Sequence, residues 1–302
     1  MTWRIATVDM GSNTLKFAVT EVHADGAETI LHTHAETVRL SAGIATTGEI
    51  EPARRDRALL ALQSYEAVGQ SLGVNAFIGV ATAALRMASN GTSLLDQIAE
   101  TTEWDISVIS GSDEARLTFV GLGHYLPASG DALLVDIGGG STEVIHARNR
   151  QMVASESLSI GSGTLSDRCF RADPPGVDAV LEANTFALGV LSESDVIGSA
   201  IGAALFLSGG NGQFLSEVSA WFEVDIPFTP EDFPRLVDRL ATLESSSVSE
   251  YLEIVQERAR MLPAGAAIVL SAIQRAQPSS LKAVPSGIRG GLISDWMASR
   301  QS

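Results

Sequence analysis

Apolar residues follow two spacings along the chain, and segments of the two kinds alternate. Short β-branched runs predict strands within 5–20 and 132–147 and at 76–82, 105–111, 204–208 and 281–286. Helical spacing predicts helices at 52–72, 177–192, 230–243, 248–262 and 265–276, with shorter helical segments at 84–91 and 113–120. Pro263 is expected to separate two of these helices, and a last helix is expected after Gly291. Alternating strands and helices predict an α/β protein.

The two halves of the chain contain a similar segment. Residues 5–20 read IATVDMGSNTLKFAVT and residues 132–147 read ALLVDIGGGSTEVIHA. Each has an apolar run, an aspartate, a glycine-rich turn and a second apolar run, which is typical of a hairpin. Aligning Asp9 with Asp136 places Lys16 on Glu143. The repeat predicts a duplicated fold with two loops whose amides cradle phosphate oxygens.

The LPASG stretch at 126–130 marks a turn just before the second copy. We therefore expect an N-terminal domain at 1–125, with the first phosphate loop, and a C-terminal domain at 126–302, with the second. The last helix could pack back on the first domain.

Composition narrows the classes of partner. The 302 residues carry a formal net charge of −16, which disfavours nucleic-acid binding. Lys16 and Lys282 are the only lysines, so an anionic ligand must be held by arginines, backbone amides or a metal. The single cysteine, Cys169, suits a reducing cytoplasm, and no apolar run is long enough to span a membrane. The first residues do not resemble a signal peptide.

Eight ordered motifs resemble those of the exopolyphosphatase and guanosine pentaphosphate phosphohydrolase (Ppx/GppA) family. They are VDMGSNTLKFAV (8–19), VRLSAGIATTG (38–48), ATAALRMASNG (81–91), VISGSDEARLTFVGL (108–122), VDIGGGSTEV (135–144), SLSIGSGTL (157–165), LSGGNG (207–212) and SGIRGGL (286–292). The resemblance covers nearly the whole chain. It implies two RNase H-like domains of the actin, Hsp70 and sugar-kinase superfamily, with the active site in the cleft between them. It also implies a cytoplasmic hydrolase that forms dimers.

Hydrolysis of a phosphoanhydride requires that the phosphoryl group be held, its charge offset and a water aligned with it. We expect donors from Gly11, Ser12 and Asn13 on one side and from Gly138, Gly139, Gly140 and Ser141 on the other. The repeat suggests that Asp9, Asp136 and Glu143 cluster, and clustered carboxylates need a cation between them. Mg²⁺ or Mn²⁺ is the expected ion.

The resemblance assigns roles to three more residues. Glu114 matches the catalytic glutamate of the family, which implies a general base in the first domain, although Asp113 and Glu114 also suit the start of a helix. Arg86 matches an arginine that would clamp phosphate, although it could be an exposed helix residue. Lys16 occupies a position where the family often has arginine or lysine, and it could equally be a surface lysine. Arg289 and the segment 208–212 are left without an assigned role, and 208–212 could be a third glycine loop or a tight turn.

Some positions depart from the family pattern. Thr164 stands where relatives commonly have arginine, Gly290 where many have glutamate, and Asn211 where threonine is usual. With so few lysines, the chain lacks the extended cationic track that a long polyanion needs. We therefore expect a substrate of short polyphosphate chains.

Three other functions stay open. Guanosine pentaphosphate could be the substrate in place of polyphosphate. A sugar or acetate kinase of the same superfamily would transfer phosphate to an acceptor, but the Glu114 segment suits water as the acceptor. A sensor of nucleotides or alarmones could keep the loops and turn over poorly, and the intact set of carboxylates argues against it.

Overall fold

The chain folds as two compact units. The computed structural model describes residues 2–24, 26–222, 227–285 and 287–300. The first unit is Met1–Val120 with Ile288–Ser302, and the second is Gly121–Gly287. None of the helices in these described ranges is long and apolar enough to cross a membrane.

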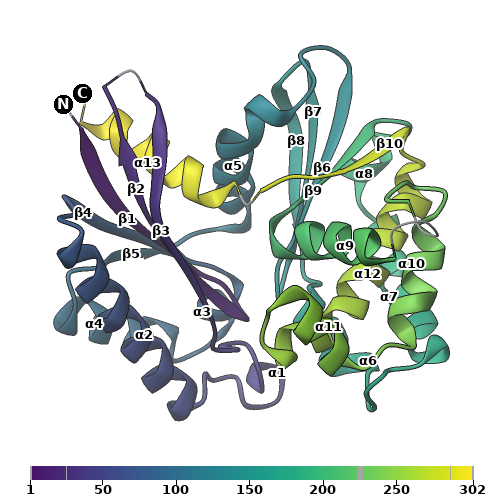
Figure 1. Cartoon of the computed structure of the whole chain (residues 1–302), viewed down its shortest axis with the longest axis horizontal. Helices are drawn as coiled ribbons and strands as arrows, with labels where there is room; N and C mark the ends of the chain where they lie inside the picture. The colour runs from purple at the N-terminus through teal and green to yellow at the C-terminus, as the bar shows by residue number, and fades with distance from the viewer. Residues whose placement is uncertain (1, 25, 223–226, 286, 301–302) are drawn as a thin grey trace. The chain divides into compact units, whose positions relative to one another are not determined.

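Each unit is built on one five-stranded mixed sheet (Figure 1). The first sheet has the order β3-β2-β1-β4-β5, and the second has the order β10-β9-β6-β7-β8. In both, the first three strands form an antiparallel meander, and the last two are parallel to the first strand. The first five strands are β1 (Trp3–Met10), β2 (Thr14–Val22), β3 (Glu28–Thr37), β4 (Ala76–Ala81) and β5 (Asp105–Val108). The second five are β6 (Asp131–Ile137), β7 (Thr142–Arg148), β8 (Gln151–Leu158), β9 (Ala204–Ser208) and β10 (Ser280–Ala283). The shared topology confirms the duplication predicted from the two aspartate–glycine segments.

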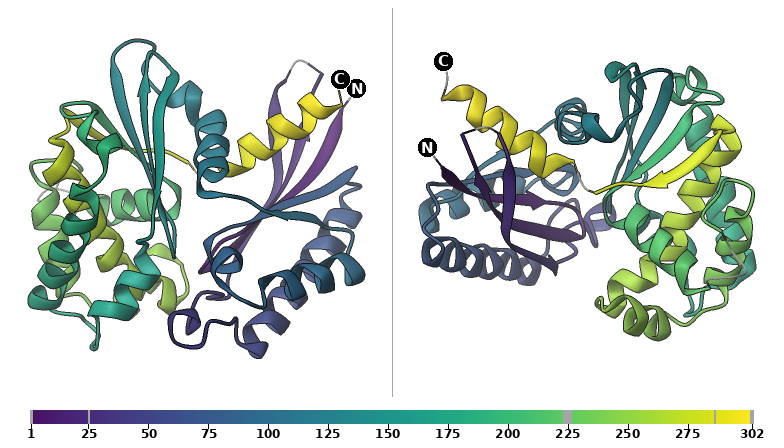
Figure 2. Two further views of the ribbon diagram at one scale, coloured as in Figure 1. Left: turned by 180° about the vertical axis from the view of Figure 1, so that it is seen from behind. Right: turned by 45° about the horizontal axis from the view of Figure 1, so that its top comes forward.

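Helices cover both faces of the first sheet. Side chains alternate along a strand, so Ala6, Val8 and Met10 of β1 share one face and pack with α2 (Pro52–Ser71) and α4 (Gly91–Thr101). Ile5 faces the other way and packs with α13 (Ile288–Ser299), which runs beside β1 and β2 (Figure 2). The remaining helical segments of this unit are α1 (Ile44–Thr47), α3 (Ala83–Met87) and most of α5 (Gly111–Leu122). Burial on both faces explains why β1 reads as a nearly continuous apolar run.

The second unit buries the odd-numbered residues of β6 beneath a larger set of helices. Leu133, Val135 and Ile137 belong to one core with α7 and α12. The helices here are α6 (Ser162–Cys169), α7 (Val177–Ser192), α8 (Asp195–Gly198), α9 (Gly209–Trp221), α10 (Phe233–Ala241), α11 (Ser245–Leu252) and α12 (Gln256–Ala276), with a 3₁₀ turn η1 (Gly123–Tyr125).

Two sequence predictions in the second unit are wrong. Pro263 does not end a helix but lies inside α12. Burial of α12 through the core outweighs the roughly 3 kcal/mol that an internal proline costs. The helix expected at 248–262 is split between α11 and α12 at Glu253, which has a left-handed φ of 53°. At 208–212, where the sequence leaves open either a glycine loop or a tight turn, Ser208 ends β9 and residues 209–212 form the first turn of α9.

Other elements differ in extent or were not predicted. The last helix begins at Ile288, before the expected start after Gly291. The strand expected at 281–286 is β10, which ends at Ala283, and Ser286 lies outside the described residues. The sequence did not predict most of β3, or β8, α1, α4, α6, α8 and α9. Strand β3 lies at the edge of its sheet and is largely exposed, so it has no buried apolar run.

Candidate active site

The first hairpin places Asp9 opposite Lys16. The two residues are partners in the β1–β2 register, and Lys16 Nζ lies 3.4 Å from Asp9 Oδ2. The turn is closed by the Gly11 amide, which donates to the Thr14 carbonyl at 3.1 Å. The sequence alignment placed Lys16 on Glu143 but did not predict its pairing with Asp9. Lys16 therefore offsets the charge of Asp9, and its contact with phosphate stays a prediction.

The loop of the first hairpin is held by the segment that follows β3. The Asn13 carbonyl accepts from the amides of Val38 and Arg39 at 2.9 and 2.8 Å, and the Ser12 carbonyl accepts from Ser41 at 3.0 Å. Ser12 Oγ is buried and has no hydrogen-bond partner among the described residues, so it is a donor that a ligand could use. Arg39 has a φ of 56°, a strained conformation for arginine. The sequence did not predict that the segment 38–48 shapes this loop.

The second hairpin places two carboxylates opposite each other. Asp136 and Glu143 are register partners of β6 and β7, so their side chains lie on the same face of the sheet. Both are buried, with 7% and 2% of the residue exposed. Ser208 Oγ donates to Asp136 Oδ2 at 3.1 Å, and Ser157 Oγ donates to Glu143 Oε1 at 2.8 Å. The two hydroxyl donors fix the orientation of the two carboxylates.

The sequence analysis missed Ser157 and Ser208 as partners of the two carboxylates. Both serines lie in motifs quoted above, SLSIGSGTL and LSGGNG. Ser157 is the register partner of Glu143 in the β7–β8 hairpin, whereas Ser208 lies on β9, which is distant in sequence and is brought beside Asp136 only by the order of strands in the sheet.

The start of α6 orients the second glycine loop. The Ser162 amide donates to the Gly138 carbonyl at 2.9 Å, and the amides of Gly163 and Thr164 both donate to the Gly139 carbonyl at 3.0 Å. In a trans peptide the C=O and the following N–H point in opposite directions. The two amides that follow these carbonyls therefore point away from α6, where an anion could accept from them.

The remaining loop residues fit the same arrangement. The Gly138 amide closes the turn on the Ser141 carbonyl at 2.9 Å, as Gly11 does in the first hairpin. Among the described residues none accepts a hydrogen bond from the amide of Gly139, Gly140 or Ser141. A Cβ on Gly161 would lie 2.5 Å from the Gly139 carbonyl carbon, so only glycine allows α6 to approach this closely. Phosphate binding by these amides stays a prediction that the geometry favours.

Asp113 and Glu114 are neighbouring carboxylates of α5 that make different contacts. Asp113 belongs to the cap of the helix: its amide donates to Ser110 Oγ at 3.1 Å, and Ser110 Oγ donates to Asp113 Oδ2 at 2.6 Å. Glu114 is 6% exposed and accepts from Arg86 Nη1 at 3.0 Å. Both carboxylates lie in the first turn of α5, as the alternative reading expects, and Glu114 is in addition buried against a cation.

Arg86 is a partly buried residue of α3 rather than an exposed helix arginine. Its side chain is 24% exposed. Both hydrogen bonds of the Arg86 side chain come from Nη1, which donates to Glu114 Oε2 at 3.0 Å and to the Ile109 carbonyl at 2.7 Å. Within the described part of the chain, Nε and Nη2 have no such partner, so one edge of the guanidinium can bind a phosphate oxygen.

The carboxylates fit a divalent cation of the Mg²⁺ type. No three His, Cys, Asp or Glu side chains among the described residues form a group that could hold a metal. Mg²⁺, however, is usually held by one or two carboxylates together with substrate phosphates and waters. The facing pair Asp136 and Glu143 meets that requirement. Asp9 belongs to the other unit, and its part in metal binding stays a prediction.

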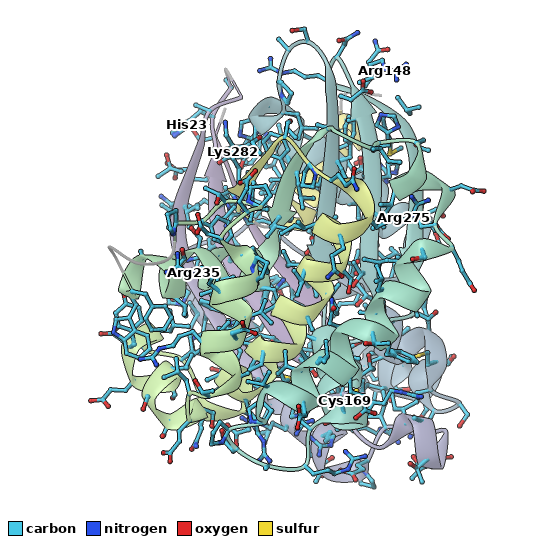
Figure 3. The ribbon with its side chains drawn as sticks, turned by 90° about the vertical axis from the view of Figure 1, so that its right-hand side faces the viewer. His23, Arg148, Cys169, Arg235, Arg275 and Lys282 are labelled. Atoms are coloured by element: carbon cyan, nitrogen blue, oxygen red, sulfur yellow. The ribbon has the colours of Figure 1, made fainter. Side chains whose placement is uncertain are left out.

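Two further residues belong to neither hairpin. Cys169 lies on α6 (Figure 3), and burial raises the pKa of its thiol, so it is a packing residue rather than a nucleophile. Arg289, near the start of α13, has a buried Nε with no hydrogen-bond partner in the described ranges.

The fold resembles that of solved structures. An exopolyphosphatase from Cytophaga hutchinsonii superposes with a TM-score of 0.87 at 24% identity, covering 98% of both chains. The Aquifex aeolicus member of the Ppx/GppA family gives a TM-score of 0.79 at 22% identity and covers 100% of both. These matches confirm the predicted α/β fold of two RNase H-like domains.

Sequence comparison gives the family. The exopolyphosphatase 1 of Mycobacterium tuberculosis is 25% identical over 299 residues, which cover 96% of this chain and 87% of that protein. The model of the Ppx/GppA phosphatase family matches residues 19–300. The chain therefore belongs to the Ppx/GppA phosphatase family, and it is a hydrolase of that family.

Proposed function

We propose that this chain is a metal-dependent phosphoanhydride hydrolase that releases terminal phosphate from inorganic polyphosphate. The observation that carries the proposal is the buried Glu114, held by Arg86 and distinct from the helix cap at Asp113. The relatives named exopolyphosphatase support the choice of substrate. The proposal requires residues of both units, since Glu114 and Arg86 belong to the first and Asp136 and Glu143 to the second.

The chain's own residues supply binding, orientation and proton transfer. The amides of Gly139, Gly140 and Ser141, with Gly11, Ser12 and Asn13, hold phosphate oxygens. Nε and Nη2 of Arg86 bind the terminal phosphoryl group, while Nη1 fixes Glu114. Glu114 then orients the attacking water and accepts its proton at Oε1 or Oε2.

Asp136 and Glu143, with Asp9 as a third candidate, would hold Mg²⁺ or Mn²⁺. When bound, the ion offsets negative charge on the phosphate oxygens. Ser208 and Ser157 each donate a hydrogen bond to one of these two carboxylates and so orient it towards this role.

We propose short chains as the preferred substrate. The net charge of −16 and the presence of only two lysines leave little cationic surface for a long polyanion. Thr164, at the position where relatives commonly have arginine, caps α6: its Oγ1 accepts from the Gly161 amide at 3.1 Å. It therefore adds no positive charge beside the second loop.

Two alternatives use the same residues. Guanosine pentaphosphate presents a phosphoanhydride at its 5′ end and would need the same loops and base. A low-turnover sensor of nucleotides or alarmones would bind through the loops without releasing phosphate.

Dimer formation and a cytoplasmic location also belong to the proposal. The cytoplasmic location is proposed because the single cysteine suits a reducing compartment.

One assay separates these functions. Phosphate release is measured with Mg²⁺, without any acceptor, from tripolyphosphate, polyphosphate hundreds of units long, guanosine pentaphosphate and ATP. The proposal expects the highest kcat/KM with short polyphosphate and none with the Glu114→Gln variant. Equal rates on long chains contradict the short-chain preference. Faster release from guanosine pentaphosphate supports the first alternative, and binding without release supports the sensor.

A further inference from the structure

Asn211 connects α9 to the strand that carries Asp136. It is the third residue of the helix, and its Nδ2 donates to the Ile137 carbonyl at 2.7 Å. The same nitrogen lies 3.4 Å from Ser162 Oγ on α6. Ile137 stands between Asp136 and the first glycine of the loop. The bond therefore fixes the peptide that joins the carboxylate to the phosphate loop.

Gly265 of α12 packs against the other end of the Asn211 side-chain amide, at Oδ1. A Cβ on Gly265 would lie 2.2 Å from Asn211 Oδ1. The φ of Gly265 is not in the left-handed region, so the position needs glycine for space rather than for conformation. The amide of Asn211 is thus confined between β6 and α12.

The same turn of α9 also touches Asp136 itself. Ser208 Oγ donates to Asp136 Oδ2 at 3.1 Å, and a Cβ on Gly209 would lie 2.7 Å from Asp136 Oδ1. Three residues of this turn therefore act on the segment 136–138 from one side. On the loop side, the start of α6 binds the next two carbonyls.

We propose that Asn211 is a positioning residue of the second phosphate loop. By holding the Ile137 carbonyl, it sets the orientation of the following Gly138 amide, which closes the turn on Ser141. Loss of the bond lets this peptide rotate, which displaces Asp136 on one side and the loop amides on the other. The inference rests on the proposed function only in taking this loop as the phosphate site. The turn at 208–212 then serves as a support for the site rather than as a ligand loop.

The test uses substitutions on two different helices. Asn211→Leu keeps the approximate shape and removes the donor, and Asn211→Asp replaces the donor with an acceptor that repels the Ile137 carbonyl. Gly265→Ala leaves Asn211 in place and pushes its amide away. Asn184→Leu is the matched control, because Asn184 Nδ2 donates to Ser271 Oγ at 2.8 Å in the interior of the same unit. Gly189→Ala is the control for the glycine, since nothing lies within 4 Å of its added Cβ.

Two readouts are needed. The first is kcat/KM for tripolyphosphate with Mg²⁺, which we expect to fall about 10- to 100-fold in the Asn211 and Gly265 variants and to stay near wild type in the controls. The second is hydrogen exchange of the peptides that cover 137–145, which should be faster in the Asn211 and Gly265 variants only. Because both changes act on one amide, the loss in the double variant should be less than the product of the single losses.

The outcomes distinguish this inference from the proposed function. Wild-type kcat/KM and wild-type exchange in Asn211→Leu would overturn the positioning role. If the wild-type protein releases no phosphate from any polyphosphate, the proposed function fails, while the exchange result still decides the role of Asn211. Should Asn211→Leu be insoluble, Asn211→Ser removes the same amide with a smaller side chain and gives the same two readouts.

Discussion

Arg86 Nη1 lies 3.0 Å from Glu114 Oε2, so an arginine of α3 and a carboxylate of α5 form an ion pair beside the Ile109 carbonyl. A general base must first lie within hydrogen-bond distance of the water that it deprotonates, so its side chain has to be held in one position. The pair fixes Glu114, and the rest of the guanidinium stays available for phosphate.

Glu114→Gln should abolish turnover while substrate binding remains measurable. The amide is isosteric and can still accept from Arg86, but it cannot take a proton from water. We expect kcat to fall about 100- to 10,000-fold, with the dissociation constant for tripolyphosphate within a few-fold of wild type. Single-turnover phosphate release and calorimetric binding measure the two quantities.

The neighbouring residue provides the control. Asp113→Asn removes a carboxylate one position away that caps the helix at Ser110. It should lower stability slightly and leave kcat within about two-fold, since an exposed helix cap contributes about 1 kcal/mol to folding. Equal loss of kcat in both variants would refute the assignment of Glu114 as the base.

Arg86→Lys should lower kcat/KM although the positive charge remains. An ammonium group cannot bridge Glu114, the Ile109 carbonyl and a phosphate oxygen with the fixed geometry of a guanidinium. We expect a 10- to 100-fold loss, which steady-state kinetics with tripolyphosphate would detect. Arg116→Lys on α5, where the arginine pairs with exposed Asp295, should stay near wild type. A wild-type rate in Arg86→Lys would mean that only its charge matters.

The sequence predicted the hairpins better than it predicted their supports. The alignment of Asp9 with Asp136 is confirmed, since Asp9 pairs with Lys16 and Asp136 with Glu143 at equivalent positions of two hairpins, and hairpins are local structures whose turn fixes the partners. The supports of the second loop come from Ser157, Ser162, Ser208 and Asn211, which lie on separate elements. The contacts of Ser162, Ser208 and Asn211 depend on how elements distant in sequence pack together, which local patterns do not specify, whereas Ser157 is the register partner of Glu143 in the β7–β8 hairpin.

Local patterns also failed where tertiary packing dominates. Pro263 is a strong local signal for a helix end, yet the apolar residues on both sides are buried in one core and keep α12 continuous. At 248–262 the helical stripe includes Tyr251 and Val255, which are 42% and 50% exposed. Tyr251 and Val255 match the helical spacing of apolar residues but are not buried in the core. The spacing therefore predicted one helix where the structure has two, separated at Glu253.

Glu143→Gln should weaken binding of a divalent cation. One of two facing carboxylates would become neutral, and Mn²⁺ binding to the substrate-free protein, measured by electron paramagnetic resonance, should weaken about 10-fold or more. Ser157→Ala removes the donor to Glu143 Oε1 and should give a smaller loss in the same direction. Ser155→Ala, on the same strand, is the control and should bind as wild type. Unchanged Mn²⁺ affinity in Glu143→Gln would exclude this residue as a ligand.

Asp131 should make the stability of the second unit depend on pH. Its pKa is lowered, first by the hydrogen bond with His146 Nε2 at 2.7 Å and then by Arg148 Nε at 2.8 Å (Figure 3 shows Arg148 at the end of β7). A carboxyl whose pKa is lower in the folded state stabilises the fold above its unfolded pKa of about 3.9, and that stability is lost as pH falls through the folded pKa. Asp131→Asn should therefore be less stable than wild type at pH 6, and the difference should shrink towards pH 3.

Urea unfolding at several pH values measures this difference. Asp238→Asn is the control, because Asp238 is exposed on α10 and makes no hydrogen bond or ion pair with the described residues. It should show no change in the difference with pH. A difference for Asp131→Asn that stays constant from pH 6 to pH 3 would contradict the coupling to His146 and Arg148.

Arg258→Met should stabilise the protein. Burial lowers the pKa of Arg258 to about 10, and its guanidinium lies 4.4 Å from the centre of the Phe214 ring without an ion pair among the described residues. The pKa of Arg258 is lower in the folded than in the unfolded protein, so keeping its guanidinium charged lowers the free energy of unfolding. This cost is fully present at neutral pH, which lies below both pKa values. A methionine fills similar space without the desolvation cost, so the free energy of unfolding should rise by about 1–2 kcal/mol at pH 7. Arg239→Met is the control, because Arg239 is exposed and its contact with Phe222 is longer, at 5.4 Å. A large loss of stability in Arg258→Met would show that the contact with Phe214 outweighs the cost of burying the charge.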